Sequence, residues 1–213
     1  MITVVPSIMS YDHCNLLQGV HIAENYNVKR LHVDIMDGVF VKNISFGPQL
    51  VHDLHQHTSL KLDVHLMLQH PEYFVEQFIE YGADSIAIHQ ESSGNIAKIL
   101  SNIKAHHCAC ALAINPGTVP MTNLISLVDY ILVMGVHPGF SGQKFIPDTM
   151  NTIKKLIEYR QKNELNYQIA VDGGVTDELA IQLAEIGVDT IVSGNSFFRS
   201  PQKFMQSLQQ FLK

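Results

Sequence analysis

The segment Gly187-Val188-Asp189-Thr190-Ile191-Val192-Ser193-Gly194 holds the unit that decides the fold. A glycine follows an amphipathic stretch, a short β-branched run comes next, and a second glycine ends that run. Glycine adopts the left-handed conformation that often ends a helix, and β-branched side chains favour strands. The same turn recurs at Gly82-Ala83-Asp84-Ser85, again before an apolar run. The repeat predicts modular connections that lead from a helix into a strand.

Short apolar runs alternate with amphipathic stretches along the whole chain. The runs predict eight strands, at residues 2–5, 30–34, 61–65, 85–88, 109–114, 130–133, 168–171 and 190–193. Helices are expected at 11–26, 71–81, 95–105, 147–162, 177–186 and 201–211, where apolar residues lie three and four apart. Strands that are apolar on both faces are typical of a parallel sheet covered by helices.

This alternation predicts one (β/α)8 domain, a TIM barrel, over residues 1–213. A doubly wound open sheet uses similar connections and is the alternative. The chain has 213 residues, of which 46% are hydrophobic and 16% charged, so it can bury one sizeable core. That length is short for a barrel but sufficient, because the fold needs at least about 200 residues.

The charge and the apolar pattern exclude several kinds of protein. A formal net charge of −6 without a basic cluster argues against a nucleic-acid-binding protein. No apolar run approaches the roughly 18 residues of a membrane span, and the amino terminus lacks a signal peptide, so we expect a cytoplasmic protein. The three cysteines, Cys14, Cys108 and Cys110, are expected to be reduced core residues.

Two predicted strands end in residues that commonly bind metals. In a TIM barrel the active site lies at the carboxyl ends of the strands. Because side chains alternate along a strand, His32 and Asp34 share one face of the second strand. Asp63 and His65 likewise share one face of the third, where His65 is nearer the open end. We expect Asp63 to orient a ligand histidine.

Asp172 ends the seventh strand and completes the candidate metal site. In a closed ring of eight strands it faces Asp34 across the mouth of the barrel. A single aspartate or histidine at a strand end is usually structural, but four such residues together would be costly to bury unless coordinated. Two imidazoles and two carboxylates predict one divalent metal ion, with zinc favoured and iron, manganese or cobalt also acceptable.

The other histidines are less informative. His89 and His137 are expected to end apolar strands and stay candidates for a role in the site. Six more are expected at the surface, without a catalytic role: His52, His55, His57, His70, His106 and His107.

Glycine-rich loops follow the last three predicted strands. They contain Gly139 to Gly142 with Phe140 and Ser141, then Gly173-Gly174, then Gly194-Asn195. Loops in this part of a TIM barrel commonly bind phosphate through backbone N–H groups. The sequence therefore predicts a small phosphorylated substrate.

Several motifs resemble the ribulose-phosphate 3-epimerase family, in order and over nearly the whole chain. They are Pro6-Ser7-Ile8-Met9-Ser10, His32-Val33-Asp34-Ile35-Met36-Asp37-Gly38, Asn43-Ile44-Ser45-Phe46-Gly47-Pro48, Asp63-Val64-His65-Leu66-Met67, Asn115-Pro116-Gly117-Thr118, the stretch from His137 to Phe145, and Val171-Asp172-Gly173-Gly174-Val175. Together these motifs are far more specific than a generic barrel. The resemblance leaves a homo-oligomer open.

The resemblance implies a role for each part of the candidate site. His32, Asp34, His65 and Asp172 would hold the metal, and Asp34 and Asp172 would also form an acid–base pair that inverts C3 of a ketose phosphate through an enediolate. Ser7 and His65 would contact the sugar. The phosphate would lie against Gly139, Phe140, Ser141, Gly142, Gly194 and Asn195. Met36, Met67 and Met134 would line the reacting centre.

Departures from the family pattern bear on the substrate. The family usually has Asn at His137, a hydroxyl residue at Gly135, a second Gly at Ser141, and His and Pro at Val39 and Lys42. All fall in predicted loops at the catalytic end of the barrel. We favour D-ribulose 5-phosphate as the substrate, with D-allulose 6-phosphate as the alternative.

Two other functions would suit a barrel with these phosphate loops. A decarboxylase or aldolase of this fold would need a lysine at a strand end, whereas Asp34 is followed by Ile35-Met36-Asp37. A barrel that only binds a sugar phosphate has no need of an acid–base pair, and both aspartates are present. We therefore expect an epimerase.

Overall fold

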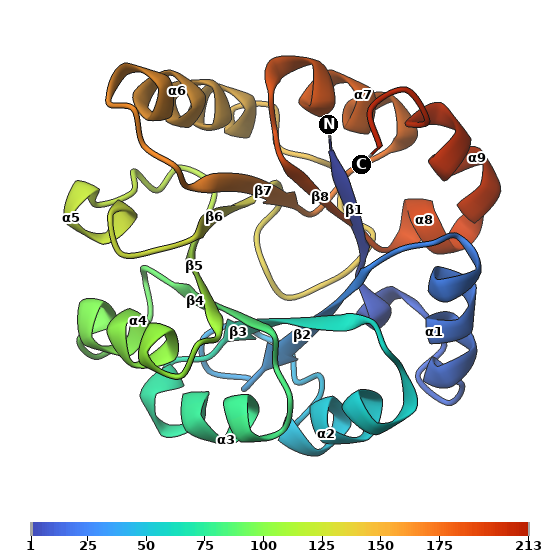
Figure 1. The fold of residues 1–213 in the computed structure, drawn as a ribbon, viewed down its shortest axis with the longest axis horizontal. Helices are drawn as coiled ribbons and strands as arrows, with labels where there is room; N and C mark the ends of the chain where they lie inside the picture. The colour runs from blue at the N-terminus through green and yellow to red at the C-terminus, as the bar shows by residue number, and fades with distance from the viewer. Residues whose placement is uncertain (1, 213) are drawn as a thin grey trace.

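The computed structural model describes residues 2–212, in which eight parallel strands form one curved sheet (Figure 1). The strands are β1 Thr3–Pro6, β2 Arg30–Met36, β3 Lys61–Met67, β4 Ser85–His89, β5 Ala109–Ile114, β6 Tyr130–Met134, β7 Gln168–Asp172 and β8 Thr190–Ser193. Consecutive strands pair from β2 to β8, and β8 pairs with β1. A parallel bridge between Ser7 and His32 joins the remaining two edges. The predicted TIM barrel is confirmed, and the open sheet is excluded.

The helices form a ring around the barrel (Figure 1). They are α1 Leu16–Asn25, α2 Pro48–His57, α3 Val75–Glu80, α4 Ile96–Ala105, α5 Thr122–Ile125, α6 Thr149–Lys162, α7 Asp177–Ile186, α8 Asn195–Arg199 and α9 Pro201–Ser207. Short 3-10 helices lie at Ile8–Ser10 and Pro71–Tyr73. Among residues 2–212, no helix has both the length and the apolar character needed to cross a membrane.

Several helix boundaries differ from the sequence-based prediction. The helix expected at 11–26 begins at Leu16, because Asp12 holds a turn by accepting hydrogen bonds from the backbone of Cys14 and Asn15. The helix expected at 71–81 divides into the 3-10 helix and α3, and the one expected at 201–211 ends at Ser207. Three helices were not predicted from the sequence: α2, in which only Val51 and Leu54 are buried, and the short helices α5 and α8.

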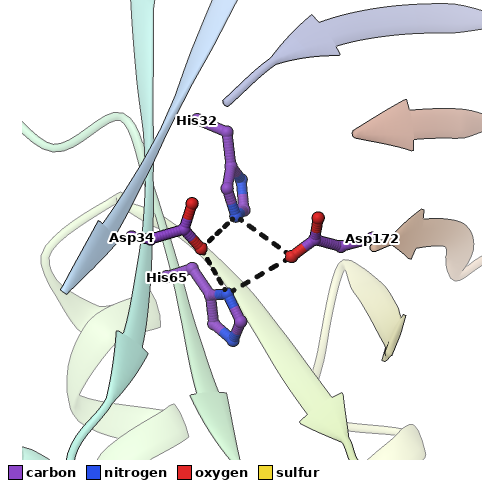
Figure 2. Close-up of side chains that lie close together, drawn as sticks. All are labelled: His32, Asp34, His65 and Asp172. Carbon is purple, nitrogen blue, oxygen red and sulfur yellow. Dashed lines mark hydrogen bonds and ion pairs between the residues drawn. The ribbon is translucent and has the colours of Figure 1, made fainter. Parts of the chain in front are cut away.

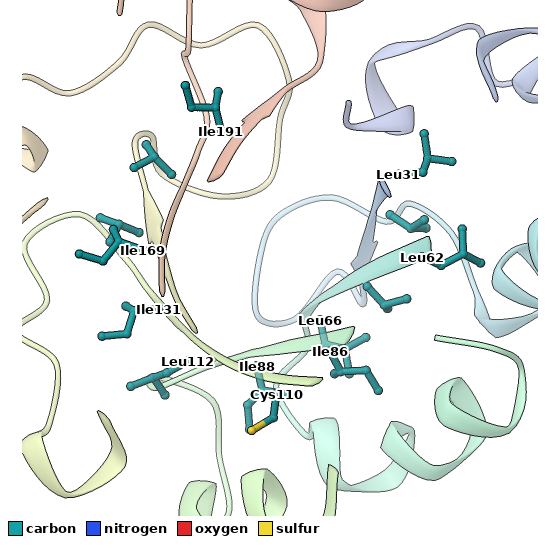
Figure 3. Close-up of a cluster of buried hydrophobic side chains, with 14 of the residues drawn as sticks. Leu31, Leu62, Leu66, Ile86, Ile88, Cys110, Leu112, Ile131, Ile169 and Ile191 are labelled. Atoms are coloured by element: carbon teal, nitrogen blue, oxygen red, sulfur yellow. The ribbon is translucent and has the colours of Figure 1, made fainter. Parts of the chain in front are cut away.

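The alternation of side chains along the strands separates two apolar regions. Outward side chains such as Leu62, Ile131 and Ile191 pack between the barrel and the helices (Figure 3). A smaller group fills the interior: Val5, Ala87, Ala111, Ala113, Tyr130, Leu132, Met134, Ala170 and Val192. Because several of these are alanines, the interior keeps room for large polar side chains on other strands.

Two of the three cysteines lie in the core as expected, and the third does not. Cys108 and Cys110 are buried and unpaired, as predicted, and burial raises the pKa of both thiols, to about 12 and about 11. The expectation that Cys14 lies in the core is wrong. Cys14 is exposed because it belongs to the turn that Asp12 holds ahead of α1.

Aspartates fasten neighbouring strands at the amino-terminal end of the barrel. Each precedes a strand and accepts a backbone N–H from the strand before it. The bonds run from Leu62 N to Asp84 Oδ2 at 2.8 Å, from Cys110 N to Asp129 Oδ2 at 2.9 Å, and from Ile169 N to Asp189 Oδ2 at 2.8 Å. These contacts support the sheet at the end opposite the candidate site.

The glycine turn from α7 into β8 yields a testable prediction. Gly187 has φ 97° and ψ 27°, a left-handed conformation, while Gly47 has φ −115°, and a Cβ would meet nothing within 4 Å at either position. We expect Gly187→Ala to lower the free energy of unfolding by about 1 to 2 kcal/mol, because a Cβ strains only the left-handed backbone. Urea unfolding measures the change. Gly47→Ala is the control with an extended backbone and should cost less, about 0.5 kcal/mol, because it loses only the preference for glycine at the start of α2; equal losses would contradict the explanation.

Candidate metal centre and active site

Four side chains converge inside the barrel at the carboxyl ends of the strands (Figure 2). His32 and Asp34 come from β2, His65 from β3, and Asp172 from the end of β7. Asp34 and His65 are directly paired in register, which brings their side chains together. One ligand atom from each of the four residues lies within 4.8 Å of the others. The placement predicted from strand alternation is the one that the structure has.

The distances around this cluster are close to those of hydrogen-bonded ion pairs. His65 Nδ1 lies 3.2 Å from Asp34 Oδ1 and 3.7 Å from Asp172 Oδ2. His32 Nε2 lies 3.3 Å and 3.7 Å from the same two oxygens. Two nitrogens and two oxygens therefore alternate around one central point, as Figure 2 shows.

One atom of the cluster indicates that these residues fit a metal ion. His32 Nε2 is fully buried and makes no hydrogen bond, although it faces both carboxylates. A buried nitrogen without a partner is unfavourable, and coordination would satisfy it. Two imidazoles and two carboxylates form a donor set that suits a divalent first-row metal. The four residues could therefore hold one such ion.

Asp63 contacts the ring nitrogen of His32 that points away from the cluster. Its Oδ2 lies 2.9 Å from His32 Nδ1, and its other oxygen accepts hydrogen bonds from Ser85 and Tyr130. Burial opposes ionisation of Asp63, but these bonds outweigh it and lower its pKa to about 2. An ionised carboxylate only accepts, so His32 donates from Nδ1 and turns the Nε2 lone pair towards the cluster.

The two carboxylates of the cluster have pKa values shifted in opposite directions. Burial and the charge of Asp34 raise the pKa of Asp172 to about 7. Asp34 is equally buried, yet the charge of the neighbouring His32 and the contact with His65 Nδ1 lower its pKa. Burial also disfavours the charged form of His32, but the nearby aspartates outweigh it and raise its pKa. Separated pKa values are typical of carboxyl groups that take different acid–base roles.

A cavity of about 520 Å³ opens above the cluster. Asp34 and Asp172 line its floor, while His32 and His65 are fully buried beneath it. The other predicted site residues that line it are Ser7, Met36, Met67, Met134, Gly139, Phe140, Ser141, Gly142, Gly173, Gly174, Gly194 and Asn195. Ser7 Oγ donates to Asp34 Oδ2 at 2.6 Å. The structure thus gathers these predicted substrate residues around one opening, whereas His65, which was expected to contact the sugar, lies outside the lining.

Several lining residues were not predicted from the sequence. Met9, Ser10, Lys144, Ser196 and Arg199 also border the cavity. All follow the strand ends in loops or short helices, where neither alternation nor helical spacing distinguishes an inward from an outward side chain.

The structure distinguishes His89 from His137, the two histidines that stayed candidates for a role in the site. His137 lies outside the cavity lining and is exposed, because β6 already ends at Met134 and the loop carries His137 outward. The interpretation that His137 ends a strand is therefore wrong. His89 is the last residue of β4, is fully buried, and packs against His65.

Comparison with known proteins agrees with this geometry. The model of the ribulose-phosphate 3 epimerase family matches residues 3–198. The chain belongs to the ribulose-phosphate 3-epimerase family. Curated relatives include the ribulose-phosphate 3-epimerase of Chlamydia trachomatis, 40% identical and aligned over 92% of this chain and 86% of the relative. The Bacillus subtilis enzyme of the same name is 34% identical, with 93% of each chain aligned. This protein is accordingly an epimerase-type isomerase that acts on a sugar phosphate.

Solved structures with little sequence similarity share the fold. Phosphoribosyl anthranilate isomerase from Thermus thermophilus aligns with a TM-score of 0.72 at 10% identity, over 98% of this chain and 99% of that one. A tryptophan synthase α-subunit from Pyrococcus furiosus gives 0.65 at 13% identity, over 98% and 95%. At such low identity these likenesses establish the TIM barrel alone.

The raised pKa values predict how metal uptake depends on pH. A ligand carboxylate or imidazole must lose its proton before it binds the ion. Because the pKa of Asp172 is about 7 and that of His32 is raised, protons compete increasingly as the pH falls below 7. We expect the affinity of the metal-free protein for zinc to fall by about tenfold to a hundredfold from pH 7 to pH 6.

Competition with a calibrated chelator measures this affinity at each pH. Calorimetry in buffers of different ionisation enthalpy counts the protons released, and we expect more release at pH 6 than at pH 8. An affinity that stays constant from pH 6 to pH 8 would contradict the assigned pKa shifts.

Proposed function

We propose that this epimerase interconverts D-ribulose 5-phosphate and D-xylulose 5-phosphate, with Asp34 and Asp172 moving the proton at C3. The observation that carries the proposal is the pair of buried carboxylates that face each other across one cavity with pKa values shifted in opposite directions. Curated relatives named ribulose-phosphate 3-epimerase support the choice of sugar.

The opposed placement suits inversion. To invert a carbon, one group must remove a proton from one face and another must deliver a proton to the other face. Asp34 and Asp172 reach the cavity from β2 and β7, which are three places apart around the barrel. A substrate carbon between them would present one face to each carboxylate. Neither aspartate would need to move between the two half-reactions.

Their different environments suit an acid–base pair. Asp34 accepts from Ser7 and lies beside two histidine rings, so it stays ionised and can act as the base. Asp172 reaches the same cavity from the opposite wall, where it can deliver a proton to the other face. A divalent ion bound to the four residues would stabilise the negative charge that develops on the substrate oxygens. We propose zinc for this ion because two imidazoles accompany the two carboxylates.

The glycine loops suit a phosphate group. The loops after β6 and β8 approach so closely that a Cβ on Gly142 would lie 2.7 Å from Asn195 Nδ2. A Cβ on Gly174 would collide with the backbone nitrogen of Phe145. Backbone N–H groups packed this closely can bind an anion without a cluster of cationic side chains. The net charge of −6 makes such a local site necessary.

The departures from the family pattern bear little on the size of the cavity. Ser141 lines the cavity, whereas Val39, Gly135, Lys42 and His137 are outside its lining. Val39 is 72% exposed, so a smaller side chain there adds no room around the sugar. This placement favours the pentulose phosphate over D-allulose 6-phosphate.

The acid–base proposal predicts the effect of removing either carboxylate. We expect Asp34→Asn and Asp172→Asn each to lower kcat by about a hundredfold to ten-thousandfold, since an amide neither accepts nor delivers the proton. The exposed Asp53 of α2 provides the control, Asp53→Asn, which should keep full activity. Metal content and circular dichroism must be measured for every variant to separate chemistry from folding or metal loss. Normal turnover in either active-site variant would rule out the acid–base pair.

Hydrogen exchange in deuterated water gives a finer test of the two roles. Wild-type enzyme should label C3 of both epimers. A metal-loaded variant that keeps one carboxylate should label only the epimer whose C3 proton faces that residue. Labelling of the same epimer by both variants would contradict the opposed arrangement.

The cavity predicts a preference between two sugars. We expect kcat/KM for D-ribulose 5-phosphate to exceed that for D-allulose 6-phosphate by about tenfold or more, because one extra carbon unit is worth about 1 to 3 kcal/mol in a fitted site. Steady-state assays of both substrates on one preparation measure the ratio. A tenfold advantage for the hexulose phosphate would overturn the choice of sugar and leave the proton-transfer proposal standing.

A further inference from the structure

His89 lies directly behind one of the candidate metal ligands. Its ring meets that of His65 edge to edge, with centroids 5.0 Å apart and an interplanar angle of 25°, and the two Nε2 atoms are 2.8 Å apart. His89 is fully buried and outside the cavity lining, so it has no access to substrate. Because His65 Nδ1 faces the metal site, its Nε2 is free to bond with His89.

The carboxylate of Glu91 extends the contact between His65 and His89 into a chain of hydrogen bonds. Glu91 Oε2 lies 3.3 Å from His89 Nδ1, and Glu91 Oε1 accepts from Asn115 N at 2.9 Å and Thr118 Oγ1 at 2.5 Å. The contacts on Oε1 fix the carboxylate in the loop after β4. Burial opposes its charge, but these hydrogen bonds and His89 lower its pKa to about 2. Glu91 is therefore an acceptor at neutral pH.

Because Glu91 can only accept, it determines which nitrogen donates in each hydrogen bond from His65 through His89 to Glu91. A neutral imidazole donates from one nitrogen and accepts at the other. If His89 donates from Nδ1 to Glu91, its Nε2 can only accept, and His65 must donate from Nε2. In the reverse arrangement, an unprotonated His89 Nδ1 would face the carboxylate, and two buried acceptors would be left without a proton between them. At the other end, His65 Nδ1 lies 3.2 Å from Asp34 Oδ1, and a bound ion would take up its lone pair there. With an ion bound, the direction set by Glu91 therefore leaves no pair of acceptors unsatisfied.

We propose that Glu91 and His89 are positioning residues that keep the proton of His65 on Nε2 and so leave its Nδ1 lone pair for the metal. The inference deepens the proposed metal centre and rests on it. Neither residue is expected to touch the substrate or the ion. Their effect is to preselect the tautomer that can coordinate, which lowers the cost of binding.

The other candidate ligand has the same kind of support. His32 is held by Asp63, which is its register partner on the next strand, β3. His65 is held by His89, which likewise comes from the next strand, β4. In both cases a carboxylate sets the tautomer, directly for His32 and through one imidazole for His65.

Nitrogen NMR of labelled protein tests the direction of the chain without any activity measurement. In the zinc-loaded protein, we expect protons on His89 Nδ1 and His65 Nε2, with a coupling across the 2.8 Å contact between the two Nε2 atoms. In the metal-free protein, Asp34 Oδ1 lies 3.2 Å from His65 Nδ1 and competes for the His65 proton, so there only the proton on His89 Nδ1 is expected. A proton on His89 Nε2 would overturn the proposal.

Metal affinity gives a second, independent test. We expect His89→Leu to weaken zinc binding by about tenfold to a hundredfold, because His65 loses its acceptor. His89→Gln offers an amide oxygen as acceptor and should stay within about threefold to fivefold of wild type. The exposed His106 of the α4 end provides the control, His106→Leu, which should leave the affinity unchanged. Unchanged affinity in His89→Leu, or equal losses in the Leu and Gln variants, would overturn the positioning role.

Glu91→Gln serves as a further variant if His89→Leu does not fold, since the Glu91 side chain is 26% exposed. Its amide can donate to His89 Nδ1 and thereby permits the reverse direction, so we expect about tenfold weaker zinc binding and a proton on His89 Nε2. Wild-type tautomers in this variant would contradict the proposal. Failure of the wild-type protein to bind zinc would refute the metal centre instead, while the position of the His89 proton in the metal-free protein would still test the contact with Glu91.

Discussion

The burial of two carboxylates within one small cluster is the constraint on which the site depends. Asp34 and Asp172 are 3% and 8% exposed, and their side chains meet inside a largely apolar barrel. Two buried charges of the same sign repel strongly in such a medium. The two histidines offset part of this repulsion. Protonation of Asp172, whose pKa is raised to about 7, relieves the remainder. A divalent ion would replace these protons as the compensating charge.

The barrel provides this cluster through the alternation of side chains on parallel strands. Along β2, Leu31 and Val33 face the helices while His32 and Asp34 face inward. The inward positions of β4 and β5 carry Ala87, Ala111 and Ala113, which occupy little volume. Small side chains on one wall therefore make room for ionisable side chains on the other. The same alternation that builds the outer core thus positions the site.

The sequence predicted those features that depend on local periodicity. The strand ends at His32-Val33-Asp34 and at Asp172 could be placed because alternation specifies which residues share a face. The helix α2 was missed because histidine and glutamine cover most of its surface, so Val51 and Leu54 alone mark its buried side. The contact of His89 with His65 could not be derived, because it depends on the register between strands and on side-chain rotamers. Arg199 reaches the cavity from a short helix whose direction no local pattern reveals.

Aspartates have different roles at the two ends of the barrel. At the amino-terminal end, Asp84, Asp129 and Asp189 accept backbone N–H groups and tie neighbouring strands together. At the other end, Asp34 and Asp172 lie among ionisable side chains and few backbone donors. Bonds to the backbone stabilise a fixed charge, whereas ionisable neighbours make the charge depend on bound protons or ions. The backbone donors at the amino-terminal end suit stability, and the ionisable neighbours at the other end suit proton transfer. Because the two roles lie at opposite ends, loops around the site can diverge without weakening the sheet beneath it.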